Sequence, residues 1–210
     1  MPATGAPPAM TGRKLMRKDE RRAQLIRAAA KAFLAGGFAA TSLDDVAAEA
    51  GVTKMIIYRH FGSKRDLYHA VLVDARERMV GYVGPPEEYG RDTLRTLALA
   101  ARDNPDGFRL LYRQSAREPE FAGYVEEILA TARGNAEAWL RDSIADPGLR
   151  AWTAMLLPTI AYDAVLAWLD ADQPVSPENL DEMVGSVLQA LTRAAVGGAP
   201  PPTPRELAAG

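Results

Sequence analysis

The sequence predicts an all-α protein, and three observations support that prediction. Between Leu25 and Phe33 the apolar residues recur three and four positions apart, which is the spacing of one helix face. Downstream of Pro86 we find none of the alternation of apolar and polar residues that indicates half-buried strands. Helix start signals, in which proline directly follows Ser, Asn or Asp, recur there instead. The 210 residues are enough to bury a sizeable core in one large or two small domains.

Four helices are expected in the first third of the chain. The first covers residues 19–34 and is stopped by Gly36 and Gly37. The second begins after Ser42, which is placed to form a capping box with Asp45.

A glycine turn joins the second helix to the third. Gly51 lies where the backbone must be left-handed, a conformation that only glycine adopts without strain. Thr53 is expected to cap the third helix, and Ile57 and Phe61, four residues apart, to face the core. Two short helices held at an angle in this way place the second in a DNA major groove, although a solvated helical hairpin has the same pattern.

The fourth helix opens with a second capping box, formed by Ser63 and Asp66, and continues to about Tyr82. Lys64 and Arg65 lie in its first turn, where cations oppose the helix dipole. The same position suits a phosphate that meets the helix N-terminus. This local conflict indicates that function rather than stability selects the two cations.

Five more helices are expected beyond Pro86. Their ranges are 92–102, 104–115, 118–144, 146–169 and 176–195. Pro158 lies inside the fourth of them and is expected to kink it.

The segment from the end of the first helix into the fourth resembles the DNA-binding module of the TetR family of bacterial transcriptional regulators. The matching residues are Phe33, Gly37, Phe38, Thr41, Val46, Ala47, Ala50, Gly51, Val52, Thr53, Ile57, Tyr58, His60, Phe61, Ser63, Lys64 and Leu67. In that family the second helix of the hairpin reads the groove. The resemblance implies DNA contacts by Ser42, Thr53, Lys54, Tyr58, His60 and Lys64.

Two residues depart from the family pattern, because Met55 and Ile56 stand where a Gly-Thr pair is usual. They are expected to contact thymine methyl groups, as part of the DNA-binding set, or alternatively one of them is expected to pack against the first helix. The operator sequence depends on which of these holds.

Charge is distributed unevenly along the chain. Twelve of the 25 Lys and Arg but only six of the 27 Asp and Glu lie in residues 1–73, which gives this part a net charge of +6 and the remainder −8. Such asymmetry is typical of a molecule that meets DNA with one end only. The basic residues Arg13, Lys14, Arg17, Lys18, Arg21 and Arg22 form either a solvated arm or a contact with the DNA backbone or minor groove.

Composition excludes several other classes of site and location. The chain has no cysteine and only two histidines, His60 and His69, so we expect no disulfide, no metal site and no cofactor. No combination of nucleophile, base and orienting group indicates an enzyme, and we predict no catalytic residues. Residues 1–12 lack the apolar region of a secretory signal, and no apolar run approaches the about 20 residues that span a bilayer. We expect a cytoplasmic protein without a membrane partner.

The last two helices are strongly apolar, the first on nearly all sides and the second along a stripe, which predicts burial against more than one neighbour. A second copy of the chain is the simplest cover, as in the family's four-helix dimers, and its twofold axis would match a palindromic operator on double-stranded DNA. The predicted interface residues are Ala161, Val165, Trp168, Val184, Val187, Leu188 and Leu191.

Aromatic residues of the middle helices are either plain core or, as the resemblance implies, the lining of an effector pocket. The candidates are Phe108, Tyr112, Phe121, Tyr124, Trp139, Trp152 and Tyr162, together with Asp163 as a polar anchor. Asp163 is alternatively expected to pair with an arginine at the dimer seam. The effector would be a small apolar or amphipathic molecule of unknown identity.

These observations define four segments and a function. A flexible basic arm covers residues 1–18, and a helix-turn-helix DNA-binding domain covers 19–66. A helical ligand-binding and dimerisation domain covers 67–196, and a disordered tail covers 197–210. We predict a homodimeric transcriptional regulator, a repressor that a small molecule releases from its operator. The alternative is a helical ligand- or protein-binding module that has lost sequence-specific DNA reading.

Overall fold

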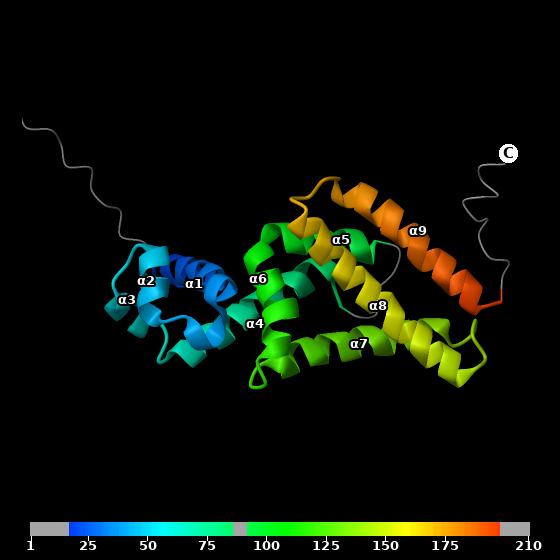
Figure 1. Ribbon diagram of the computed structural model, residues 1–210, viewed down its shortest axis with the longest axis horizontal. Helices are drawn as coiled ribbons and strands as arrows, with labels where there is room; N and C mark the ends of the chain where they lie inside the picture. The colour runs from blue at the N-terminus through cyan, green and yellow to red at the C-terminus, as the bar shows by residue number, and fades with distance from the viewer. Residues whose placement is uncertain (1–16, 86–91, 198–210) are drawn as a thin grey trace, which may run out of the picture.

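The computed structural model describes residues 17–85 and 92–197, and within those ranges every regular element is helical. The prediction of an all-α fold is therefore confirmed. One end of the elongated molecule holds α1, α2 and α3, and α4 leads from it into the other end (Figure 1). The bounds of these helices are Lys18–Ala40, Leu43–Ala50, Lys54–Tyr58 and Lys64–Val83. The predicted basic arm lies outside the described residues apart from its last two, and the predicted tail apart from Gly197.

The larger end consists of α5, α6, α7, α8 and α9, with two short turns of other helix types between α6 and α7 (Figure 1). The α-helices span Thr93–Asp103, Pro105–Arg109, Ala122–Leu140, Pro147–Asp170 and Pro177–Ala195. The π-helical turn η2 covers Leu110–Gln114, and the 3-10 turn η3 covers Ser115–Arg117. The single helix predicted over 104–115 is thus divided, and α7 begins later than the predicted residue 118.

The capping signals in the first helices were mostly predicted correctly. Gly37 breaks α1 with φ 76°, and both hydrogen bonds of the Ser42–Asp45 capping box are present. Gly51 ends α2 in the left-handed region with φ 64° and ψ 36°. Thr53 occupies the N-cap position of α3, but within the described residues its side chain makes no capping hydrogen bond, so that prediction was wrong.

Four rings from α1, α4 and the start of α7 form an aromatic joint where the two ends of the molecule meet. They belong to Phe33, Phe38, Tyr68 and Phe121, and the centroid of Phe121 lies 5.0 Å from that of Phe38 and 4.4 Å from that of Tyr68. Among the described residues the buried Tyr68 hydroxyl has no hydrogen-bond partner. Burial, and then the charge of Glu118, raise the pKa of this phenol. The joint belongs to a core cluster that includes residues from both ends of the molecule, whereas Leu140, Ile144 and Ala154 form a second, smaller cluster.

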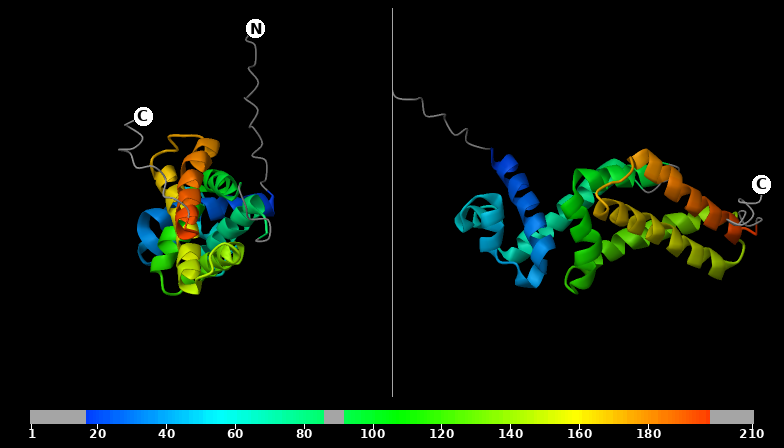
Figure 2. Two further views of the ribbon diagram at one scale, coloured as in Figure 1. Left: turned by 90° about the vertical axis from the view of Figure 1, so that its right-hand side faces the viewer. Right: turned by 45° about the horizontal axis from the view of Figure 1, so that its top comes forward.

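Helix α8 lies next to α7 and α9 in the larger end (Figure 2) and runs through Pro158 without interruption. It is long and apolar enough to cross a membrane by length and composition alone, contrary to our expectation that no segment would be. Val165, Trp168 and Leu169 are nevertheless buried inside the protomer, as in a core helix of a soluble protein. Only 44% of its most apolar window is buried, so part of its apolar surface is exposed in the protomer.

Candidate DNA-binding surface and effector domain

The α2–α3 hairpin has a buried inner face that packs on α1. Val46 and Ile57 are fully buried, Ala47 and Phe61 are nearly so, and Gln24 of α1 donates a hydrogen bond to the Ala50 carbonyl at 3.0 Å. These contacts hold the short helix α3, which has too few residues to be stable alone. The inner residues therefore set which α3 side chains face outward.

We call the exposed residues Ser42, Thr53, Met55, Tyr58 and Arg59 the outer face of the hairpin; the acidic Asp44, Asp45 and Glu49 of α2 are exposed as well. Met55 is 63% exposed and Tyr58 49%. This brings four of the predicted DNA contacts together and adds Arg59, a cation that the family pattern does not mark.

The structure separates the two residues that depart from the family pattern. Ile56 is half-buried and packs against the core, which is the internal packing that we considered for one of the pair. Met55 faces solvent instead. Of the two, only Met55 has most of its side chain available to DNA.

His60 lies beside the positive start of α1. Burial lowers the pKa of its imidazole, and the charges of Lys18, Arg21 and Arg22 lower it further. The guanidinium of Arg22 lies 5.0 Å from the centroid of the Phe61 ring, which places this cation next to the end of α3. The start of α1 thus places cations beside the end of α3.

Lys54, the first residue of α3, is already paired. Its ammonium donates to the Asp44 carboxylate of α2 at 2.8 Å, and this hydrogen bond raises the pKa of the lysine. The Asp44 side chain, which belongs to α2, is 69% exposed. A DNA phosphate that recruits Lys54 must compete with this carboxylate.

We therefore expect Asp44→Asn to strengthen duplex DNA binding about fivefold at low salt, because the substitution frees Lys54 and removes one repulsive charge. Fluorescence anisotropy with a labelled duplex measures the effect. Asp142→Asn, which changes the net charge equally but lies in the turn that follows α7, serves as the control. An equal gain in both variants would mean that net charge alone is responsible.

Lys64 makes several contacts within the protein, which the sequence did not predict. Its ammonium donates to the carbonyls of Phe38, Ala39 and Thr41 at 2.8, 3.2 and 3.0 Å, and lies 4.7 Å from the centroid of the Phe38 ring. All three of its donors are thereby used within the protein. Lys64 thereby fastens α4 to the end of α1, and its predicted phosphate contact stays a prediction.

Lys64→Met is expected to lower the free energy of unfolding by about 1–3 kcal/mol, because three carbonyls lose a charged donor. Thermal unfolding of the free protein measures this loss. The matched variant is Arg65→Met, whose guanidinium is 69% exposed and pairs with Glu120, so its loss should be below about 1 kcal/mol. A residue that served only as a phosphate contact would leave the stability of the free protein unchanged.

The predicted effector residues do not form one cluster. The rings of Phe108, Tyr112 and Tyr162 pack together, and all three are buried. The centroid of the Tyr112 ring lies 4.6 Å from that of Phe108 and 4.4 Å from that of Tyr162. Phe121 belongs to the aromatic joint, which is a core role. The Tyr124 ring instead packs against the His69 ring, with the two centroids 5.4 Å apart.

Three of the predicted effector residues are exposed, so the prediction that they line an internal pocket was wrong. Trp139 is 67% exposed and Trp152 53%, and Asp163 is also exposed. The apolar pattern of α8 predicted a helix but did not show which side of it faces the core. The alternative, that Asp163 pairs at a dimer seam, stays a prediction.

A hollow of about 380 Å³ lies between α4 and α7. Its lining residues are Val73, Arg76, Glu120, Gly123, Tyr124 and Glu127. Arg76 and Glu127 form an ion pair at 2.7 Å beside it. Of the predicted effector residues, Tyr124 alone belongs to this lining. Among the described residues no group of three or more His, Asp or Glu side chains could hold a metal ion.

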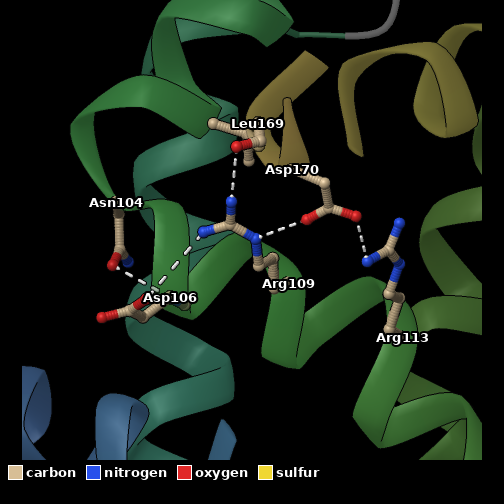
Figure 3. A network of polar contacts seen from close by, with 7 residues as sticks. Asn104, Asp106, Arg109, Arg113, Leu169 and Asp170 are labelled. Atoms are coloured by element: carbon tan, nitrogen blue, oxygen red, sulfur yellow. Dashed lines mark hydrogen bonds and ion pairs between the residues drawn. The ribbon is translucent and has the colours of Figure 1, made fainter. Parts of the chain in front are cut away.

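A polar clamp fastens α6 and η2 to the end of α8 (Figure 3). Arg109 donates to the Asp170 carboxylate at 2.9 Å and to the Leu169 carbonyl at 2.7 Å, and Arg113 pairs with the second oxygen of Asp170. Burial alone would raise the pKa of the Asp170 carboxyl, but the hydrogen bonds and charges of the two arginines outweigh it and lower that pKa. Sequence spacing could not reveal this clamp, because its partners lie about sixty residues apart.

Asp170→Asn is expected to reduce the free energy of unfolding at pH 7 by about 1 kcal/mol. The expected loss is small because the Asp170 side chain is 40% exposed, so that solvent screens its charge. A carboxyl with a lowered folded-state pKa stabilises the protein above its unfolded pKa. This stabilisation is lost as the pH falls through the folded pKa. The difference between the variant and the wild type should therefore shrink below the ordinary aspartate pKa of 3.8. Denaturant unfolding at pH 7 and pH 3 measures it, and an equal difference at both would contradict the clamp.

The predicted dimer residues divide into two groups. Val165 and Trp168 are buried within the protomer, and the Trp168 indole donates to the Val175 carbonyl at 2.8 Å. Assigning these two to the interface was therefore wrong. Ala161, Val184, Leu188 and Leu191 are half-buried, and Val187 is 56% exposed.

Comparison with known proteins agrees with this architecture. Residues 25–71 match the family model described as bacterial regulatory proteins, tetR family. Over 178 residues the chain is 32% identical to the HTH-type transcriptional activator FasR of Mycolicibacterium smegmatis, an alignment that covers 79% of this chain and 80% of that protein.

Two solved structures illustrate the likeness of fold. A TetR-like transcriptional regulator from Rhodococcus sp. RHA1 has a TM-score of 0.72 at 20% identity, covering 88% of this chain and 100% of that one. The transcriptional regulator FadR from Bacillus subtilis, in complex with stearoyl-CoA, has a TM-score of 0.58 at 17% identity, covering 81% and 97%. The helix-turn-helix motif, the family model and the long FasR alignment together establish that this chain belongs to the TetR family of bacterial transcriptional regulators.

Proposed function

We propose that this regulator binds a palindromic operator as a homodimer, and that a small apolar or amphipathic effector in its C-terminal domain changes that binding. The proposal of DNA binding is based on the outer face of the α2–α3 hairpin. It combines the exposed Met55 and Tyr58 of α3 with the exposed cation Arg59 that follows the helix, while Ile57 of the same helix is fully buried. Such a combination suits phosphates and base edges.

Exposed apolar residues on α8 and α9 support the dimer. Trp152 and Met155 of α8 are 53% and 42% exposed, and Met183 and Val187 of α9 are 62% and 56% exposed. Only Pro177 and Leu180 of α9 are buried within the protomer. An isologous pairing of these two helices would cover the apolar residues and relate two hairpins by a twofold axis.

The effector class is proposed from chemistry and likeness of fold. The buried Phe108–Tyr112–Tyr162 cluster lies inside the helical domain, and the fold resembles that of the FadR protein in complex with stearoyl-CoA. We propose that a long-chain acyl thioester, an amphipathic molecule, is the effector. Stearoyl-CoA should then release the protein from DNA, whereas free coenzyme A should not. Release by neither compound would contradict this effector class.

We propose that the protein represses transcription and that the effector relieves this repression. The proposed location is the cytoplasm, where the DNA lies. The FasR relative is named an activator, which is the opposite sign. Run-off transcription from a template that carries the bound duplex distinguishes them. Fewer transcripts on adding the protein support repression, and more transcripts contradict it.

A salt series tests the DNA-binding role itself. Each phosphate contact releases condensed counterions, so the binding constant should fall steeply between 50 and 200 mM salt, by about tenfold or more for several contacts. The alternative function, a helical ligand- or protein-binding module that has lost DNA reading, predicts no measurable duplex binding at either concentration.

A further inference from the structure

Met55 is the most exposed large apolar side chain of the hairpin, at 63%. Its neighbours on α3 are otherwise engaged, because Lys54 pairs with Asp44, Ile56 packs partly on the core and Ile57 is fully buried. The outer surface of this helix is therefore represented mainly by Met55 and by Tyr58, three residues later on the same face.

A single exposed methionine is common on protein surfaces and by itself indicates nothing. The surroundings of Met55 give its exposure a meaning. The opposite side of the helix is fixed by Ile57 in the core, so the helix cannot rotate to bury Met55 without exposing Ile57. Any duplex that approaches the outer face meets the Met55 side chain.

The chemistry of a thioether limits what Met55 can recognise. Its sulfur is a weak acceptor, and the side chain has no N–H or O–H donor. Placed against the hydrogen-bonding edge of a base, it would remove water from that edge without replacing the hydrogen bond. The major groove offers one apolar group, which is the C5-methyl of thymine.

We infer that Met55 is a specificity-determining residue that selects thymine, through its C5-methyl group, at one position in each half of the operator. The inference rests on the proposed function, because it requires α3 to enter the major groove. It extends that function by naming the base group that this chain reads.

The test replaces thymine with uracil, which removes only the methyl group. The probe is a duplex enriched from a random pool by the wild-type protein, resynthesised with deoxyuridine at one thymine position at a time. One position in each half-site should show weaker binding. The expected loss is about threefold to fourfold for one half-site and about tenfold for both, from the transfer of one methyl group out of water in each.

The same measurements on Met55→Ala assign the effect to this residue. The variant should bind the thymine and uracil duplexes equally at that position, while all other positions behave as in the wild type. Met55→Leu keeps an apolar side chain and should retain the discrimination. Because Met55 is exposed, both variants should unfold at the wild-type temperature, which excludes a folding defect as the cause.

The outcomes separate this inference from the proposed function. Absence of any enriched sequence overturns both, since no base is then read. An enriched duplex without a uracil-sensitive position overturns the inference alone. Uracil sensitivity that persists in Met55→Ala also overturns it, because another side chain then makes the methyl contact.

Discussion

Replacing Val187 with glutamate is expected to convert the proposed dimer into a monomer and to weaken operator binding by about a hundredfold or more. Val187 lies in the second half of α9 and is 56% exposed in the protomer. In an isologous interface the substitution buries two unpaired carboxylates, and a buried unpaired charge costs several kcal/mol. Loss of the second half-site also removes the gain from bivalent binding, which is about a hundredfold or more.

Sedimentation velocity and anisotropy with a palindromic duplex measure the two effects. The matched variant is Val80→Glu, which makes the same change at a 44% exposed valine near the end of α4. This control should remain dimeric and bind DNA normally. If Val187→Glu sediments as a dimer, the proposed interface on α8 and α9 is contradicted.

Phe121→Ala is expected to reduce the free energy of unfolding by about 3–5 kcal/mol, the range for deleting a buried ring. Phe121 is 3% exposed and closes the aromatic joint against Phe38 and Tyr68. Its removal would leave a cavity where α1, α4 and α7 meet. Denaturant unfolding followed by circular dichroism measures the loss.

Trp139→Ala provides the control, because the sequence pattern grouped both residues as effector-binding aromatics. Trp139 is 67% exposed, so its truncation should change the free energy of unfolding by less than about 0.5 kcal/mol. Comparable losses for the two variants would contradict their different placement in the structure.

The parts of the fold that were predicted correctly depend on neighbours close in sequence. The capping box needs only Ser42 and Asp45, and the left-handed turn needs only Gly51. The burial of Ile57 in α3 and of Phe61 just beyond it was also predicted, because two apolar residues four apart fall on one face of a helix.

The errors arose where a role depends on contacts between distant elements. Lys64 reaches carbonyls more than twenty residues away in sequence, so its position in the first turn of α4 did not reveal its role. Helix α8 is apolar on nearly all sides, and its pattern therefore could not show that Val165 faces inward while Trp152 faces outward. Which side is covered depends on where α7 and α9 pack.

Selection of duplexes from a random DNA pool by the wild-type protein tests the central claim most directly. We expect one enriched sequence in which two inverted half-sites lie about one helical turn apart or slightly more, bound by a dimer. Enrichment should survive at a salt concentration that removes nonspecific binding. A pool without any enriched sequence, whose binding disappears at modest salt, would contradict a dimer that reads DNA through α3.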